Sequence, residues 1–294
     1  MFYLTAISLG LALGAMCLGI YISLRIFNFP DITTDGSYTL GACITAIGMV
    51  SGWSIPMILL LVIVSGMLAG LSTGLIHTAL KMNSLLSGIL VMTGLYSINL
   101  AILGRSNIPL PANSKHMFKT LEVFQKSIYN ELAILIIIIA GLLIAMNYFL
   151  KTDFGLALRA TGNNTTMSRM YGIHANAYKV TGLAIANALT AFSGFLIVQL
   201  QGFADINMGI GIVILGLGAV MIGESMMNIF NAYRIPWRLA GVILGSILFR
   251  VILSVALSAG VDPLWIKLLT AIIVLAIVGV PNMFPHIKRR LEPD

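Results

Sequence analysis

The feature that most constrains the fold is a succession of nine apolar segments separated by short polar stretches. A helix needs roughly 20 apolar residues to span the hydrocarbon core of a bilayer, and most of the segments approach that length. The chain is 59% hydrophobic and only 9% charged, whereas a water-soluble domain carries about 25% charged residues. The segments are Leu4–Leu24, Ser37–Gly52, Pro56–Leu80, Ser84–Leu103, Glu131–Leu150, Tyr178–Leu200, Gly209–Gly223, Leu239–Ser258 and Leu264–Val280. We therefore expect an all-α, multi-pass membrane protein of about 8–10 transmembrane helices, folded as one transmembrane domain over residues 1–294.

Two of the nine segments, Ser37–Gly52 and Gly209–Gly223, are short and rich in glycine. Segments of this kind are typical of half-helices or broken spans. Non-helical backbone at membrane depth is tolerated only where it is buried in protein or lines a cavity. We expect both segments to lie inside the bundle.

The two Gly-rich segments also belong to an apparent internal repeat. Phe29-Pro30-Asp31-Ile32 precedes the first, and Phe203-Ala204-Asp205-Ile206 precedes the second at an offset of 174 residues. Leu68-Ala69-Gly70 and Leu239-Ala240-Gly241 follow them at an offset of 171. The pattern predicts two inverted halves, at about residues 25–104 and 200–281, an arrangement known in transporters. The alternative is chance similarity between apolar segments of low diversity.

The basic residues divide unequally between the two sets of loops. The net charge is +7, and short cytoplasmic loops are enriched in Lys and Arg, so the richer set is expected inside the cell. One set carries Arg25, Lys81, Lys151, Arg159, Arg169, Lys179, Arg234, Arg238, Lys288, Arg289 and Arg290, and the other carries Arg105, Lys115, Lys119, Lys126 and Lys267. The split predicts a cell (inner) membrane protein with an external N-terminus, a cytoplasmic C-terminus and a cytoplasmic loop at residues 151–178.

Six polar residues in or beside the spans are candidates for a translocation path, because polar groups at membrane depth usually face a cavity or a partner. For Asp35 and Asp205, capping of a nearby helix is the favoured alternative. Arg250 lies inside a span and needs a partner, for which Glu224 is one choice. The six candidates are Asp31, Thr34, Asp35, Asn99, Asp205 and Asn207.

No pattern of catalytic or metal-binding residues stands out. The two cysteines, Cys17 and Cys43, lie in apolar segments without metal-site spacing. No G-x4-G-K-[ST] phosphate loop occurs in the sequence. We therefore expect no catalytic residue, no metal and no cofactor in this chain, and no nucleic acid among its partners.

The loop at residues 151–178 differs from the other connections because it contains a short amphipathic pattern. Asn163 and Asn164 are suited to cap a helix, and Met167, Met170 and Tyr171 fall at i, i+3 and i+4, which gives a helix one apolar face. The alternative is an ordinary solvated connector.

Four stretches together resemble a known family, the permeases of ABC importers of the branched-chain amino acid and ribose type. Similarity is greatest to the subfamily assigned to tryptophan, tyrosine or uncharacterised small solutes. The stretches are FGLALRATGNN followed by GI, QGFADINMGIGIVILGLGAVMIGE, NFPDITTDGSYTLGA and NSLLSGILVMTGLYSINL.

The resemblance implies the permease subunit of an ATP-driven importer for a small solute, such as an aromatic or other amino acid. It implies a second permease copy, cytoplasmic ATPase subunits that carry the ATP hydrolysis, and an external solute-binding protein. In that family the cytoplasmic loop holds the coupling helix, which sits in a groove of the ATPase. By position, the coupling residues here would be Arg159, Gly162, Asn163, Asn164, Met167, Arg169, Met170, Tyr171 and Gly172.

Two other functions remain compatible with the sequence. One is an ion-coupled secondary transporter built from inverted repeats, and the other is a membrane-embedded enzyme. The loop at residues 151–178 distinguishes an ABC permease from a secondary transporter, because only the permease needs an element that docks onto an ATPase. The enzyme is disfavoured by the lack of a catalytic pattern.

Overall fold

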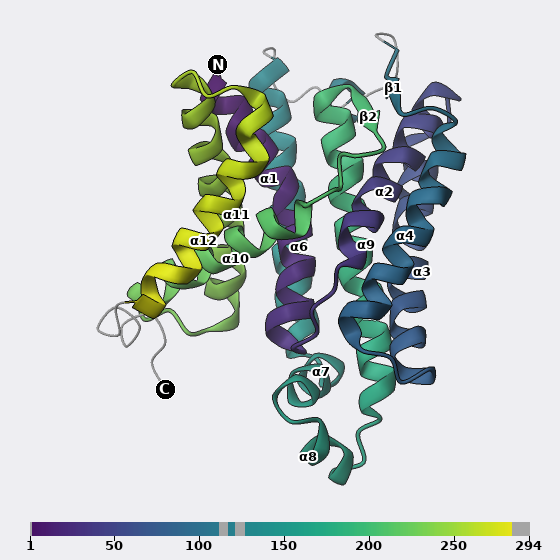
Figure 1. Ribbon diagram of the computed structural model, residues 1–294, viewed down its shortest axis with the longest axis vertical. Coiled ribbons are helices and arrows are strands. Elements are labelled where there is room, and N and C mark those ends of the chain that lie inside the picture. Colours follow the sequence, from purple (N-terminus) through teal and green to yellow (C-terminus); the bar gives the residue numbers. More distant parts are fainter. Residues whose placement is uncertain (1, 112–116, 121–126, 284–294) are drawn as a thin grey trace.

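The computed structural model describes residues 2–111, 117–120 and 127–283. Its elements pack into one elongated bundle of helices (Figure 1). The helices are α1 (Phe2–Tyr21), the π-helical η1 (Ile22–Ile26), α2 (Thr33–Val50), α3 (Ile55–Ala79), α4 (Ser84–Leu103), α5 (Met117–Thr120), α6 (Ser127–Lys151), α7 (Asp153–Asn163), α8 (Thr165–Met170), α9 (Ala175–Gln201), α10 (Ile212–Ile229), α11 (Ile235–Ser258), η2 (Pro263–Trp265) and α12 (Ile266–Met283). The strands are β1 (Asn107–Pro109) and β2 (Phe203–Asp205).

Each of the nine apolar segments overlaps one of the long helices, so the expectation of an all-α, multi-pass protein is confirmed. Within the described ranges, seven helices are long and apolar enough to cross a membrane: α1 with η1, α3, α4, α6, α9, α10 and α11. The most apolar stretches of α1 and α9 are 83% buried inside the bundle, whereas those of α4 and α6 are 22% buried. Two apolar helices thus form the centre, and others present apolar side chains outward, as lipid-facing helices do.

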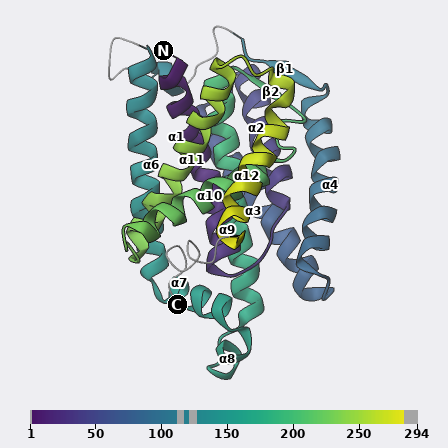
Figure 2. The same ribbon diagram turned by 60° about the vertical axis from the view of Figure 1, so that its left-hand side comes forward.

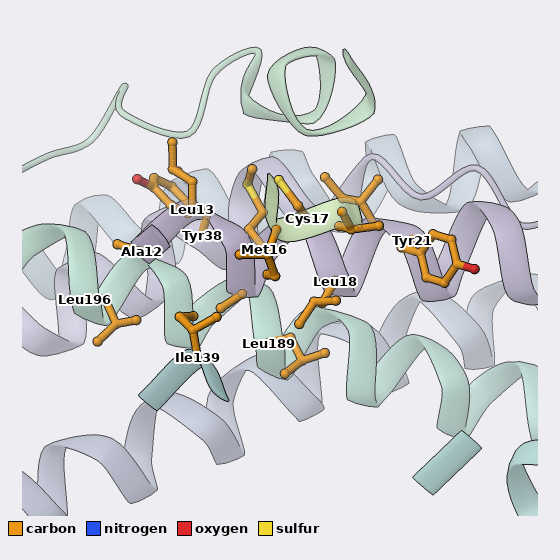
Figure 3. Packing of buried hydrophobic residues seen from close by; sticks show 14 of the residues in the cluster. Ala12, Leu13, Met16, Cys17, Leu18, Tyr21, Tyr38, Ile139, Leu189 and Leu196 are labelled. Carbon is orange, nitrogen blue, oxygen red and sulfur yellow. The ribbon is translucent and has the colours of Figure 1, made fainter. Parts of the chain in front are cut away.

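The core is built around α1. Figure 3 shows Met16 and Leu18 of α1 among side chains from three other helices, including Ile139 of α6, Leu189 of α9 and Tyr38 of α2. Met16 and Leu18 are fully buried. In lipid, van der Waals packing between helices takes over much of the role that the hydrophobic effect plays in water.

Small residues bring the helix backbones into direct contact. A Cβ atom at Gly70 would overlap the carbonyl oxygen of Leu183, and one at Gly41 would overlap that of Ala191. A Cβ at Gly194 would likewise overlap the carbonyl oxygen of Tyr38. These contacts fix α2 and α3 against α9.

The two Gly-rich segments form helices that are longer than half-helices, which corrects the expectation from the sequence. α2 and α10 have 18 residues each, a rise of about 27 Å. α2 begins at Thr33, ahead of the apolar segment, because Oδ1 of Asp31 accepts a hydrogen bond from the Thr33 N–H at 2.9 Å. α10 continues past Gly223 to Ile229, and Glu224 in this extension forms an ion pair with Arg25 at 2.6 Å.

A short antiparallel sheet, which the sequence did not predict, joins the two halves of the chain. β1 pairs with β2 in the register Asn107↔Asp205, Ile108↔Ala204 and Pro109↔Phe203. The sheet lies at the end of the bundle opposite α7 and α8 (Figure 1). It holds the chain that leads from α9 to α10 against the chain that follows α4.

The two sets of basic residues lie at opposite ends of the bundle. The turns and helix ends near α7 and α8 carry Arg25, Lys81, Lys151, Arg159, Arg169, Lys179, Arg234 and Arg238. Arg105 and Lys267 lie toward the other end, with the N-terminus (Figure 1). Lys288, Arg289 and Arg290 lie outside the described residues. By the positive-inside rule we expect the α8 end to face the cytoplasm, and the ends are named accordingly below.

Cysteine labelling tests this orientation. Thr166 of α8 and Ser106 before β1 are exposed at opposite ends, while the native Cys17 and Cys43 are buried. In intact spheroplasts, a membrane-impermeant maleimide should modify Ser106→Cys and leave Thr166→Cys unmodified until the membrane is permeabilised. The unsubstituted protein should stay unmodified throughout. Labelling in the reverse order would invert the topology.

Candidate functional site

The starts of α2 and α10 meet inside the bundle, although they are far apart in the sequence. The carboxylate of Asp35, in the first turn of α2, accepts hydrogen bonds from the N–H groups of Gly211 at 2.8 Å and Val213 at 2.9 Å. Gly211 precedes α10 with a φ of 82°, which favours glycine. The carboxylate therefore satisfies N–H groups that have no acceptor within their own helix, and it stabilises the positive end of the α10 dipole.

The chain before α10 is in close contact with α2. A Cβ atom at Gly209 would overlap the carbonyl oxygen of Asp35 and Oγ1 of Thr39. The segments Asp31–Gly41 and Asp205–Gly211 are thus joined by hydrogen bonds and by backbone packing. Capping by Asp35 is confirmed, but it caps α10 and not its own helix.

A second polar cluster fixes the start of α2 to α3 and α9. Asp31 is 3% exposed, and its Oδ2 accepts a hydrogen bond from Nδ2 of Asn187 at 2.7 Å. Oδ1 of Asn187 accepts one from the Ser37 hydroxyl at 2.6 Å. Oγ1 of Thr33 and Oγ1 of Thr73 lie 2.7 Å apart. Every member is buried, so this cluster satisfies polar groups within the chain.

The remaining path candidates divide between the interior and the outer end. Thr34 is buried and donates to the carbonyl oxygen of Asp31, and Asn99 is buried and donates to that of Gly36. Asp205 lies in β2, where it accepts hydrogen bonds from the Asn207 N–H at 2.8 Å and from Nδ2 of Asn107 at 3.3 Å. The structure thus brings four of the six candidates together around α2 and places Asp205 and Asn207 with the outer sheet.

The pairing suggested for Arg250 is wrong. Glu224 forms its ion pair with Arg25 of η1, at 2.6 Å. α10 therefore uses its one carboxylate at the cytoplasmic end of the bundle, where η1 ends.

The cytoplasmic loop contains two helices, and the first of them is packed against the bundle. Thr152 caps α7 by accepting a hydrogen bond from the Gly155 N–H at 3.3 Å. A Cβ at Gly162 would overlap the carbonyl oxygen of Ile26 and the Cα of Phe27. α7 is therefore seated on η1, which leads directly into the start of α2.

The second helix, α8, projects beyond the ends of the spans (Figures 1 and 2). Asn164 caps it by accepting a hydrogen bond from the Met167 N–H at 2.9 Å, as the sequence predicts, whereas Asn163 is the last residue of α7. Met167, Met170 and Tyr171 are 52%, 81% and 76% exposed. Apolar side chains exposed together on a helix that projects into water indicate a docking surface.

The flanks of α8 stiffen it. Arg169 donates a hydrogen bond to Oδ1 of Asn176 at 3.2 Å, and Gly172 turns the chain with a φ of 79°. Arg159 and Asn163 lie away from the exposed face of α8, because both line a cavity between α7 and the bundle. Of the nine coupling candidates, those in and next to α8 form one exposed surface, and those in α7 contact the spans.

Sequence reasoning missed several polar residues of these sites. Asn187 is fully buried in α9 and joins Asp31 to Ser37. The sequence does show this amide side chain inside an apolar segment. Burial of an amide is costly unless it is hydrogen-bonded, so a partner could have been expected. Tyr21 and Arg238, which line the cavity next to Arg159, gave no signal, since a lone Tyr or Arg at a span end is ordinary.

The fold and these sites define a class. A multi-pass helical bundle, two shorter helices whose starts are joined inside it, and a projecting helix with exposed apolar side chains on its basic side are features of a membrane transport subunit. The chain belongs to the family described as "Branched-chain amino acid transport system / permease component", whose family model matches residues 2–278. It is the membrane-spanning permease component of an ABC importer for a small solute.

Individual relatives agree with the family assignment. The chain is 38% identical over 282 residues to the tyrosine transport system permease protein of Clostridioides difficile (strain R20291), covering 95% of this chain and 91% of the relative. It is 34% identical to an uncharacterized protein of Rickettsia prowazekii (strain Madrid E), with 92% and 94% covered. It is 26% identical to the autoinducer 2 import system permease protein LsrC of Escherichia coli O9:H4 (strain HS), with 83% and 68% covered. No solved structure matches significantly.

Proposed function

We propose that this permease imports an aromatic amino acid, with tyrosine as the first candidate. The observation that carries the proposal is the 38% identity, over 95% of this chain, to a tyrosine transport permease. The chain works with a second permease copy, a cytoplasmic ATPase that hydrolyses the ATP, and an external solute-binding protein. The family membership supports the ATPase and the binding protein as partners.

The cytoplasmic loop at residues 151–178 supplies the contact with the ATPase. Met167, Met170 and Tyr171 provide the exposed apolar anchors, and Arg169 provides the polar rim. α7 rests on η1 through Gly162, and η1 continues into the chain that starts α2. A movement of α8 therefore has a short packed route to the interior, and packed elements transmit such movements as rigid bodies.

Two inverted halves within one transmembrane domain are supported by the pattern of helix contacts. In this comparison α1, α2, α3 and α4 correspond to α9, α10, α11 and α12. α3 packs on α9, and its counterpart α11 packs on α1. α2 packs on α9, α3 and α4, and its counterpart α10 packs on α1, α11 and α12. Corresponding helices run in opposite directions along the bundle (Figure 1). On this pattern the halves begin at α1 and α9, earlier than the predicted residues 25 and 200.

The translocation path follows from this arrangement as a proposal. It runs beside the junction of Asp35 with the start of α10, where the two halves meet. Thr34, Asn99 and Asp31 hold α2 in place there. Asp205 and Asn207 lie at the outer end, where they are placed to meet a solute delivered from outside.

Reconstituted transport tests the proposed substrate. Proteoliposomes containing the permease and its ATPase, supplied with the binding protein and internal ATP, should accumulate labelled tyrosine. Excess tryptophan or phenylalanine should compete, because a site for an aromatic ring accepts either, whereas leucine should compete poorly. Liposomes loaded with ADP are the control. Uptake driven by an ion gradient without ATP would contradict the mechanism, and uptake blocked by leucine alone would contradict the substrate class.

A further inference from the structure

A basic cavity lies at the cytoplasmic end of the bundle, apart from both the α2–α10 junction and the exposed face of α8. Its volume is about 400 Å³. Its walls come from α1 with η1, from the end of α6, from α7, and from the turn and first residues of α11. The polar side chains that line it are Tyr21, Arg25, Arg159, Asn163, Tyr233 and Arg238.

The charge of the cavity is not balanced. Three of its lining side chains are arginines, and none is acidic. Glu224, which lies outside the lining, pairs with Arg25. Two guanidinium groups therefore remain without a carboxylate partner in the described lining, and close packing of like charges is unfavourable without an anion between them.

Arg159 has the clearest need for a ligand. Its Nε is buried and has no hydrogen-bond partner among the described residues, and a buried donor without an acceptor is costly. Arg238 lies with its guanidinium 5.9 Å from the centre of the Tyr233 ring, and Tyr21 lines the same cavity. The cavity thus combines Arg238, which is positioned by an aromatic ring, with Arg159, whose Nε lacks a hydrogen-bond acceptor.

We propose that this cavity binds the phosphate of an anionic phospholipid from the cytoplasmic leaflet. A phosphate offers several acceptor oxygens, and arginine pairs with it through two parallel hydrogen bonds. The phosphate oxygens satisfy Arg159 and Arg238, and Arg25 keeps its partner Glu224.

The position of the cavity favours a lipid over a soluble anion. It lies at the ends of the spans nearest α7, on the side that the basic residues predict to be cytoplasmic, and basic pockets between helices on that side bind anionic lipids. Its lining also includes Leu150, Leu156 and Ile235, which suit the glycerol and upper acyl chain of a lipid and contribute nothing to a free phosphate. Tyr21 and Tyr233 are of the residue type enriched at this interface.

Lipid titration of the purified, delipidated protein in detergent tests the proposal. Dioctanoyl phosphatidylglycerol should raise the Tm of the unsubstituted protein in a saturable way, because a ligand that binds the folded state stabilises it. Dioctanoyl phosphatidylcholine should not. Arg159→Gln and Arg238→Gln should each weaken the apparent affinity by about 10-fold or more, since each removes a charged hydrogen bond. Arg234→Gln, at an exposed basic residue outside the cavity, should retain the wild-type affinity.

The variants test the location of the site, and the choice of ligand tests whether it binds a lipid. Equal phosphatidylglycerol shifts in the unsubstituted protein, Arg159→Gln and Arg238→Gln would overturn the site. Inorganic phosphate that reproduces the shift at constant ionic strength would show a soluble anion and overturn the lipid assignment. If Arg159→Gln does not fold, Arg238→Gln carries the test. Native mass spectrometry of protein freshly extracted from membranes should independently show phosphatidylglycerol retained by the unsubstituted chain and lost from the cavity variants.

Discussion

Replacing Asp35 with alanine is expected to destabilise the permease by about 3 kcal/mol or more. The carboxylate accepts hydrogen bonds from the N–H groups of Gly211 and Val213, and a hydrogen bond to a charged group contributes about 1.5–3 kcal/mol. Asp35 is 7% exposed and both hydrogen bonds are partly buried, so water replaces the lost acceptor poorly. The free energy of unfolding, measured by SDS titration from mixed micelles, should fall by this amount, and transport should be lost.

Two variants control this prediction. Asp35→Asn retains one acceptor oxygen and should lose less stability than Asp35→Ala. Asp205→Ala removes a carboxylate whose bonds to Asn207 and Asn107 are at the outer end, and it should lose about 1 kcal/mol or less. If Asp35→Ala were no less stable than Asp205→Ala, the junction between α2 and α10 would not hold the halves together.

The positions of the long helices were predictable, because hydropathy is a local property. Each apolar segment overlaps one helix, and the pattern of Asn164, Met167, Met170 and Tyr171 predicts both the cap and the exposed face of α8. The helix ends were less predictable. α2 starts early beside Asp31 and α10 ends late beyond Glu224, and both polar residues have partners that hydropathy does not represent.

The partners of polar residues were the least predictable part of the site. Asp35 binds N–H groups 176 and 178 residues away, and Asp31 binds Asn187 across 156 residues. Such pairs depend on which helices become neighbours, and periodicity in one segment carries no information about that. The same holds for the cavity around Arg159, whose walls come from four parts of the chain.

The docking surface on α8 leads to the second large effect. Replacing Met170 and Tyr171 together with aspartate should abolish coupling to the ATPase. These side chains are 81% and 76% exposed in this chain, so their replacement costs the bundle little. In a complex they would be buried anchors, and burying a carboxylate without a partner is strongly unfavourable. Loss of an anchor costs about 2 kcal/mol or more, so ATPase affinity should fall by roughly 30-fold or more.

The measurement must separate docking from folding. Met170→Leu with Tyr171→Phe keeps an apolar face of similar size and should copurify with the ATPase as the unsubstituted permease does. The aspartate variant should keep its Tm and its amount in the membrane, yet lose copurification and solute-stimulated ATP hydrolysis. Because the main contacts of α8 in the described residues are with its neighbours α7 and α9, a fall in Tm would point to a structural role. Normal transport by the folded aspartate variant would show that the ATPase binds elsewhere.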